Sequence, residues 1–334
     1  MCTSLILMSQ EGPVFARAMQ WHLPNMNWKL VLTPKGTISP LYEEEGKKVK
    51  FPSRYAALTI QTPLAENVAI DGQNEAGLSV SAHYLPYFTK YPTNTSATHK
   101  SISVTDFANA ILAHHASVTE VAHYLQSCML RGPDQEYILP LDLHFLISDQ
   151  TGENIVVESI QGKTVIHHNA LGVLTNAPNY AWHLVHLHDY LLLTPEFESV
   201  QHQRTALQLE AFSQGSGTMG MPGGLTSADR FVRAVFFKNT FPALETLDEV
   251  MPYIAQTIET FNFPLGSVVT SFQERVLFET TQFTLLKDLV RGAWYIRSAH
   301  HLNYHHLNVV SFFLENRAFS IDLDTYPSIA APCE

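Results

Sequence analysis

CTSLILMSQEGPVFARAMQW, residues 2–21, contains two apolar runs on either side of a Gly-Pro turn. The first run covers residues 4–8 and the second begins at residue 14. Two short runs of this kind, joined by a turn, are typical of a β-hairpin. Pairing of its strands would carry Arg17 into the molecule and place it beside Cys2.

Cys2 directly follows the initiator Met1. If Met1 is removed, the chain begins with a thiol and a free α-amino group on the same residue. An α-amine has a pKa of about 7.7–8.0 and a thiol a pKa of about 8.5, so the amine can take the thiol proton near neutral pH. Cys2 is thus either a nucleophile with its own base or an incidental second residue, and the rest of the sequence has to decide.

Three further segments carry recognisable motifs: DGQNEAGLSVSAHYLP at 71–86, LTNAPNYAWHL at 174–184 and GMPGGLTSADRFVRA at 220–234. Together with residues 2–21 they resemble, in order and spacing, the motifs of the choloylglycine hydrolase family. That family comprises conjugated bile acid hydrolases and penicillin V acylases, which are N-terminal-nucleophile hydrolases. A YxVxxD-like segment at 283–288 extends the resemblance over nearly the whole chain.

The resemblance implies an α+β fold, a four-layer αββα sandwich in which two largely antiparallel sheets pack face to face. The predicted elements agree, because runs of strands are separated by helices. Helices are expected at 106–114 and after Ser117, Thr226 and Thr246, each of which is followed three residues later by an acidic capping partner. Helical spacing after Ser117 places Cys128 on a buried stripe. Strands are predicted at residues 5–8, 14–19, 30–33, 57–61, 68–70, 78–83, 143–148, 155–159, 163–168, 172–175, 273–279, 284–287 and 293–297.

Amide hydrolysis needs a nucleophile, a proton carrier and donors directed at the oxyanion. The resemblance implies that the side-chain amide of Asn176 is one oxyanion donor and the backbone N–H of Tyr84 the other. The alternatives are a turn asparagine before Pro178 and a plain aromatic residue at the end of a strand.

Two arginines, Arg17 and Arg230, match arginines that the family holds near the nucleophile. Positive charge beside a thiol lowers its pKa and favours the thiolate. Arg230 could instead lie on a helix surface. However, a cation in the first turn of a helix is disfavoured by the macrodipole, which favours an anionic or functional partner for it.

Gln20 is the main departure from the family pattern. The family reads RNMDW where this chain reads RAMQW at residues 17–21, and the family's aspartate hydrogen-bonds the region of the N-terminal amine and thiol. Glutamine can accept a hydrogen bond from the amine but brings no charge, so the amine should be less basic. Gly224 also replaces an aspartate of the family. Either altered substrate choice or reduced activity follows.

The composition favours a globular protein with a large core. The chain has 334 residues, of which 46% are hydrophobic. Length alone predicts about two domains, but the motifs extend from end to end, so we expect one domain over residues 1–334. The net charge of -11 disfavours nucleic acid and anionic membranes as partners.

A cytoplasmic location is expected from the termini and the cysteines. No apolar run approaches the roughly 20 residues of a membrane span, and the N-terminus lacks the layout of a signal peptide. The three cysteines, Cys2, Cys128 and Cys333, form no disulfide framework. A reducing compartment would also keep Cys2 a thiol.

Seventeen histidines raise the question of a metal site. The clusters at 183–188 and 300–306 lack the cysteine pairs or the helical HExxH pattern of zinc sites. We therefore expect surface histidines, no metal and no cofactor.

The sequence thus predicts a hydrolase that cleaves a linear N-acyl amide through an acyl-cysteine intermediate. Trp21, Tyr84, Tyr87 and Phe88 are candidates for an apolar acyl pocket. Penicillin V-like amides, conjugated bile salts and N-acyl homoserine lactones remain open as substrates. Tyr84 favours the first, because penicillin V acylases carry tyrosine at this position. A catalytically weakened relative with a binding role is the alternative.

The segment from 190 to 220 points to a homo-oligomer. In the family this stretch is an excursion that packs between the subunits of a homotetramer. Here it holds three consecutive leucines at 191–193, which would be unfavourable on an exposed excursion unless a partner covered them.

Overall fold

The fold is described from a computed structural model. It describes residues 1–22, 26–62, 65, 67–93, 100–137, 141–168, 171–196, 213–272 and 274–324. Cys333 and part of the 190–220 segment therefore lie outside the described residues.

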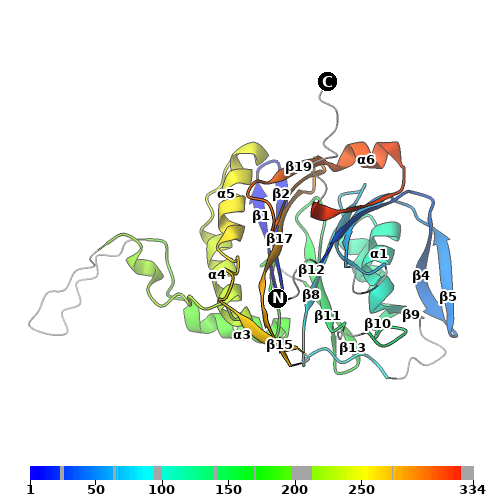
Figure 1. The fold of residues 1–334 in the computed structure, drawn as a ribbon, viewed down its shortest axis with the longest axis horizontal. Coiled ribbons are helices and arrows are strands. Elements are labelled where there is room, and N and C mark those ends of the chain that lie inside the picture. Colours follow the sequence, from blue (N-terminus) through cyan, green and yellow to red (C-terminus); the bar gives the residue numbers. More distant parts are fainter. Residues whose placement is uncertain are drawn as a thin grey trace, which may run out of the picture.

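A six-stranded sheet contains the N-terminal hairpin at its centre (Figure 1). All its neighbouring strands are antiparallel. In spatial order the strands are β14 (Val173–Leu174), β1 (Cys2–Ser9), β2 (Gly12–Trp21), β17 (Thr280–Asp288), β18 (Ala293–Ser298) and β19 (His305–Asn308).

An eight-stranded antiparallel sheet packs against the first one. Its strands are β13 (Lys163–His168), β12 (Asn154–Ile160), β11 (Leu143–Ser148), β8 (Ser79–Tyr84), β7 (Ala69–Asn74), β6 (Ala57–Gln61), β3 (Lys29–Thr33) and β20 (Phe319–Asp322).

Helices cover the outer face of each sheet, which gives four layers (Figure 1). On the six-stranded sheet lie α4 (Ser227–Thr240) and α5 (Leu247–Glu259), and on the eight-stranded sheet α1 (Val104–His114) and α2 (Val118–Leu125). The αββα sandwich with two antiparallel sheets is confirmed. The remaining described helices are α3 (Tyr180–His186) and α6 (Val309–Glu315).

Alternation along β2 divides its side chains between two cores. Ala16 and Ala18 belong to the core under α4 and α5, where small side chains let the helices approach the sheet. Met19 belongs to the core between the two sheets, which also contains Cys2. Arg17 lies on the same side of the strand as Met19, because side chains alternate with a period of two.

The capping pairs begin the helices where they were expected. Thr226 accepts a hydrogen bond from the N–H of Asp229, and Thr246 forms a complete capping box with Glu249. Ser117 caps α2 by accepting a hydrogen bond from the N–H of Glu120.

One prediction of local structure was wrong. The helix after Ser117 ends at Leu125, and Cys128, although buried, begins β10 (Cys128–Arg131). This strand joins β9 (Lys100–Ser103), β4 (Ile38–Glu44) and β5 (Lys47–Pro52) in a smaller sheet that the sequence did not predict. The strand predicted at 273–279 is present as β16 (Arg275–Phe278), which forms a hairpin with β15 (Val269–Phe272), a strand that the sequence did not predict.

Among the described residues, we find no helix long and apolar enough to cross a membrane.

Candidate active site

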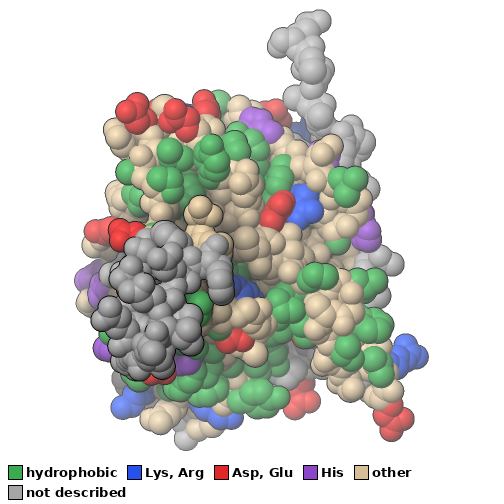
Figure 2. Space-filling model, turned by 90° about the vertical axis from the view of Figure 1, so that its left-hand side faces the viewer, with side chains coloured by type: hydrophobic (Ala, Val, Ile, Leu, Met, Phe, Trp, Pro, Cys, Tyr) green, Lys and Arg blue, Asp and Glu red, His purple; other side chains and the backbone are tan. Residues whose placement is uncertain are grey.

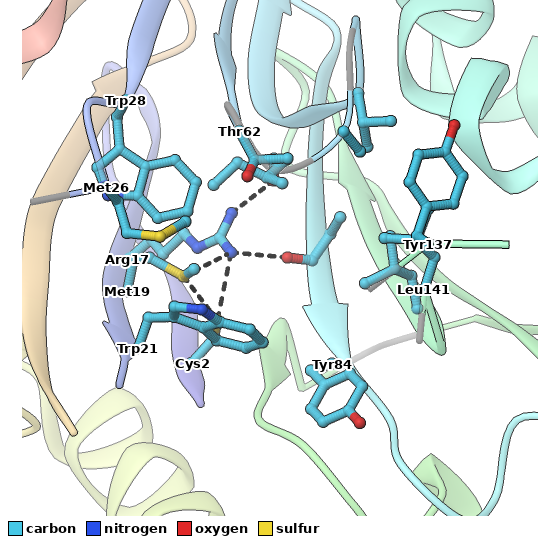
Figure 3. A pocket seen from close by; sticks show the side chains of 15 residues that line it. Cys2, Arg17, Met19, Trp21, Met26, Trp28, Thr62, Tyr84, Tyr137 and Leu141 are labelled. Carbon is cyan, nitrogen blue, oxygen red and sulfur yellow. Dashed lines mark hydrogen bonds between the residues drawn. The ribbon is translucent and has the colours of Figure 1, made fainter. Parts of the chain in front are cut away.

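Cys2 is the first residue of β1 and its side chain is buried between the two sheets. It pairs with Met19 across the hairpin, and its thiol donates to the Met19 sulfur over 3.1 Å. The Nη2 atom of Arg17 lies 3.3 Å from the Cys2 sulfur (Figure 3). The hairpin thus brings Arg17 to Cys2 as the sequence predicted.

Arg17 is fully buried and is held by the eight-stranded sheet. Its Nη1 donates to Asp71 Oδ2 at 2.8 Å and Ser81 Oγ at 2.9 Å, and its Nη2 donates to the Ala82 carbonyl at 2.6 Å. Burial opposes the charge, but Cys2 and Asp71 outweigh it and raise the pKa of the Arg17 guanidinium. Arg17 is therefore a fixed positive charge beside the sulfur.

Asn176 lies two residues after the end of the short strand β14 and contacts the backbone of Cys2. Its Oδ1 accepts from the Cys2 N–H at 2.7 Å and from Arg230 Nη2 at 3.0 Å. Its Nδ2 donates to the Tyr84 carbonyl at 2.8 Å, and its backbone N–H donates to Ser227 Oγ, also at 2.8 Å. The amide is consequently fixed from both ends next to the nucleophile.

The backbone of Tyr84, at the end of β8, faces Asn176. Successive residues of an antiparallel strand direct their backbone groups to opposite sides. The N–H of Leu85 donates to the Asp142 carbonyl at 2.7 Å, so the backbone groups of Tyr84 point the other way, toward Asn176. On that side the ladder with β7 ends at Ser81, so the N–H of Tyr84 lies past the last paired residue.

Arg230 lies in the first turn of α4 and is fully buried, not on the helix surface. Its Nη1 donates to the Cys2 carbonyl and to Thr3 Oγ1, both at 2.5 Å. Burial lowers the pKa of Arg230 to about 10. The first turn of a helix is unfavourable for a cation. Here that position directs the Arg230 guanidinium at the Cys2 carbonyl.

Gln20 contacts the start of the chain through its backbone. Met1 N donates to the Gln20 carbonyl at 2.6 Å, and Gln20 N donates to the Met1 carbonyl at 2.7 Å. Its side-chain nitrogen instead donates to the Phe261 carbonyl at 3.0 Å. Within the described chain, the buried Gln20 Oε1 has no hydrogen-bond partner. The carboxylate nearest the Met1 amine is that of Glu279, with Oε2 at 3.6 Å.

An apolar pocket opens next to the Cys2 sulfur (Figure 3). Trp21 and Tyr84 line it, as predicted, with their rings edge to face at a centroid distance of 5.9 Å. Tyr87 and Phe88 do not line it, because both are exposed on the turn after β8. Most other lining residues are apolar and come from both sheets and the loops between their strands: Met19, Met26, Trp28, Ala65, Val68, Ile70, Ala82, Leu141 and Leu143, with the more polar Thr62 and Tyr137.

His183 is buried, which corrects the expectation that the histidines at 183–188 lie on the surface. Its ring stacks on Phe231 at 4.5 Å, and Nε2 donates to the Asn176 carbonyl at 2.9 Å. Burial lowers the pKa of His183 to about 4, so the ring is neutral near pH 7. No group of side chains suited to a metal occurs in the described part of the chain.

Three residues that position the site received no role from the sequence. Asp71 opens a motif that was recognised only as a pattern, although a carboxylate at its start could have suggested a partner for a buried arginine. Ser227 holds both Thr175 and Asn176. Glu279 lies between β16 and β17, and no motif in the sequence pointed to it.

Comparison with known proteins agrees with this geometry. The sequence model for linear amide C–N hydrolases of the choloylglycine hydrolase family matches residues 2–322. A bile salt hydrolase/transferase of Clostridium perfringens is 32% identical over 246 residues, which cover 72% of each chain.

Solved structures of two such enzymes have a similar fold. The mutant C2A of the conjugated bile acid hydrolase from Clostridium perfringens matches with a TM-score of 0.80 and 26% identity over 96% of each chain. Penicillin V acylase from Agrobacterium tumefaciens matches with a TM-score of 0.76 and 23% identity, over 97% of this chain and 92% of that one. The chain belongs to the choloylglycine hydrolase family, whose members hydrolyse C–N bonds in linear amides.

Proposed function

We propose that this protein hydrolyses N-acyl amides with Cys2 as the nucleophile, after removal of Met1. The observation that carries the proposal is the Arg17 guanidinium 3.3 Å from the Cys2 sulfur, with Asn176 fixed on the other side of the same residue. A relative supports it: the conjugated bile acid hydrolase of Clostridium perfringens was solved as its mutant C2A, so that protein also has a cysteine at position 2.

The reaction would proceed through a covalent acyl-enzyme. The α-amine of Cys2 takes the thiol proton, and the sulfur attacks the amide carbon to form a C–S bond. The carbonyl oxygen becomes an oxyanion, which the second N–H of Asn176 Nδ2 and the N–H of Tyr84 would stabilise. The C–N bond of the substrate then breaks, and the product amine leaves with the proton that the Cys2 α-amine returns to it. Water, deprotonated by the same amine, hydrolyses the thioester.

The acyl group that fits the pocket is apolar and contains an aromatic ring. The lining is mostly carbon, and the edge-to-face pair of Trp21 and Tyr84 favours a third ring at centroid distances of about 4.5–7 Å. We therefore favour penicillin V-like phenoxyacyl amides. Conjugated bile salts are the second candidate, because a relative at 32% identity is named a bile salt hydrolase/transferase. A reducing cytoplasm would keep Cys2 a thiol.

Replacing the nucleophile tests the proposal directly. Cys2→Ser should lose nearly all hydrolysis of penicillin V and of conjugated bile salts, because an alcohol is a poorer nucleophile than a thiol for an amine base of this pKa. Release of the amine product is measured, and circular dichroism checks the fold. The matched control is Cys128→Ser, which changes a buried thiol on β10 and should keep activity. Comparable activity in the folded Cys2→Ser protein would refute the mechanism.

Asn176 is proposed as an oxyanion donor. Asn176→Ala should lower kcat by about 100- to 1,000-fold, as loss of one such donor does elsewhere, with a smaller effect on KM. The measurement is steady-state kinetics on the best substrate found, with the thermal transition as a folding check. Unchanged turnover in a folded variant would remove Asn176 from the reaction.

A change at position 20 tests whether charge there affects the Cys2 amine. Gln20→Asp adds a negative charge, which raises the pKa of the Cys2 amine, so a higher pH is needed to make the amine neutral and active. The acid limb of the pH profile of kcat/KM should therefore move to higher pH. Gln20→Asn has nearly the same shape as the aspartate without its charge and should leave the limb in place. Identical profiles for the two variants would exclude an electrostatic role of position 20.

We propose that this protein forms a homo-oligomer through the face that Figure 2 shows, on which hydrophobic side chains form several patches. Leu191 and Leu192 are 75% and 94% exposed, which is unfavourable for two adjacent leucines without a partner surface. The parent protein should form a tetramer by light scattering, and the double change L191S/L192S should lower its mass. A monomeric parent at working concentration would contradict this.

A further inference from the structure

Lys287, on β17, is a fully buried lysine that holds the same carboxylate as Arg17. Its Nζ lies 2.5 Å from Asp71 Oδ1, 2.6 Å from Ser79 Oγ and 3.3 Å from the Gly72 carbonyl. An ammonium has three donors, and the structure offers three acceptors. The ring of Phe15, 4.1 Å from Nζ, adds a cation–π contact.

These contacts describe a protonated lysine. Burial and the charge of Arg17 lower the pKa of Lys287, and the attraction of Asp71 offsets part of that lowering. All three polar neighbours can accept a hydrogen bond, and one of them carries a full negative charge. The geometry therefore favours the charged form despite the burial.

The charges of this cluster do not balance. Asp71 Oδ2 accepts from Arg17 and Asp71 Oδ1 from Lys287, so two cations share one carboxylate. All three side chains are fully buried. If Arg17 and Asp71 were alone, they would form a neutral pair, and Asp71 would offset part of the field of Arg17 at the sulfur. With Lys287 present the cluster carries a net charge of +1, and the Cys2 sulfur is the group at its other end.

The other charged and titratable groups around Cys2 are Arg230 of α4, Glu279 before β17, His83 of β8 and the terminal amine. The Nδ1 of His83 donates to the Thr175 carbonyl at 2.9 Å, which leaves Nε2 of the neutral ring as the acceptor for Ser4 Oγ at 2.8 Å. Burial and the charge of Arg17 lower the pKa of His83 well below its usual range. The Glu279 carboxylate lies 3.6 Å from the terminal amine of Met1. None of these groups contributes to the charge balance of Asp71 through a described hydrogen bond.

We propose that Lys287 is a positioning residue for the reaction: it neutralises Asp71, so that the positive charge of Arg17 acts on the Cys2 sulfur and stabilises the thiolate. The proposal rests on the proposed function, since only a thiolate nucleophile needs this charge. It gives Asp71 the role of joining the two cations and orienting Arg17.

The test measures the alkylation rate of Cys2 by iodoacetamide between pH 5 and 10, with mass spectrometry of the Cys2 peptide and no substrate. In Lys287→Met, alkylation at pH 6–7 should slow by about tenfold or more, because the buried cluster loses one positive charge and stabilises the thiolate less. The plateau at high pH should not change. Lys287→Arg restores a cation and should return the profile toward that of the parent.

Two further variants separate charge from packing. Lys238→Met removes another partly buried lysine, which donates to the Ile6 carbonyl of β1. This variant should leave the pH profile of Cys2 alkylation unchanged. The double variant D71N/K287M removes one charge of each sign and restores a net charge of +1, so it should alkylate like the parent. It also decides the case if Lys287→Met alone does not fold.

A folded Lys287→Met protein with the parent's profile would overturn the proposal, and so would a D71N/K287M protein as slow as Lys287→Met is expected to be. The outcome is independent of the amidase assignment. A protein that shows the shift but hydrolyses no amide would contradict the proposed function and leave the electrostatic coupling of Lys287 to Cys2 intact.

Discussion

The burial of the Arg17 guanidinium is the constraint on which the arrangement of the site depends. Arg17 belongs to β2 in one sheet, yet the carbonyls of Ile70 and Ala82 and the side chains of Asp71 and Ser81, all in the other sheet, accept its hydrogen bonds. An unpaired buried charge would be strongly destabilising, by about 3–5 kcal/mol. The two sheets therefore have one relative position that satisfies Arg17. Because Cys2 is paired to the same hairpin, that position also places the sulfur.

The remaining polar groups come from strand ends that converge at one point. β1 begins there with Cys2, β8 ends there with Tyr84, and β14 leads into Asn176. Backbone groups beyond the end of a strand have no ladder partner, so they can face a substrate. The pocket lies on the apolar side of this point, between the sheets, whereas Arg230 approaches from the helical layer. An acyl group and an oxyanion can thus be bound in chemically different surroundings a few atoms apart.

Most of the fold and the set of site residues could be predicted from the sequence, because they depend on local patterns: the hairpin, the helix caps and four motifs in order. The sheet with β4 and β5 could not. The sequence of β5, KKVKFP, is mostly exposed, and its alternation from Lys48 to Phe51 is too short to predict a strand by itself. The burial of His183 depends on which face of α3 meets Phe231. Lys287 is similarly hidden, since a lysine in a strand is expected at the surface and its burial depends on Asp71, which is far away in the sequence.

The glutamine at position 20 fits this charge arrangement better than it fits a dead site. A carboxylate there would raise the pKa of the amine, and it would also oppose formation of a thiolate nearby. Arg17, with its charge left free by Lys287, acts in the opposite direction and favours the thiolate. A neutral Gln20 brings no negative charge to the start of the chain. Under the proposed mechanism, the missing carboxylate would favour the neutral base and Arg17 would favour the anionic nucleophile. A scaffold that had lost catalysis would have no reason to keep two buried cations on one carboxylate beside a cysteine, because such a cluster destabilises the fold unless an anion balances it.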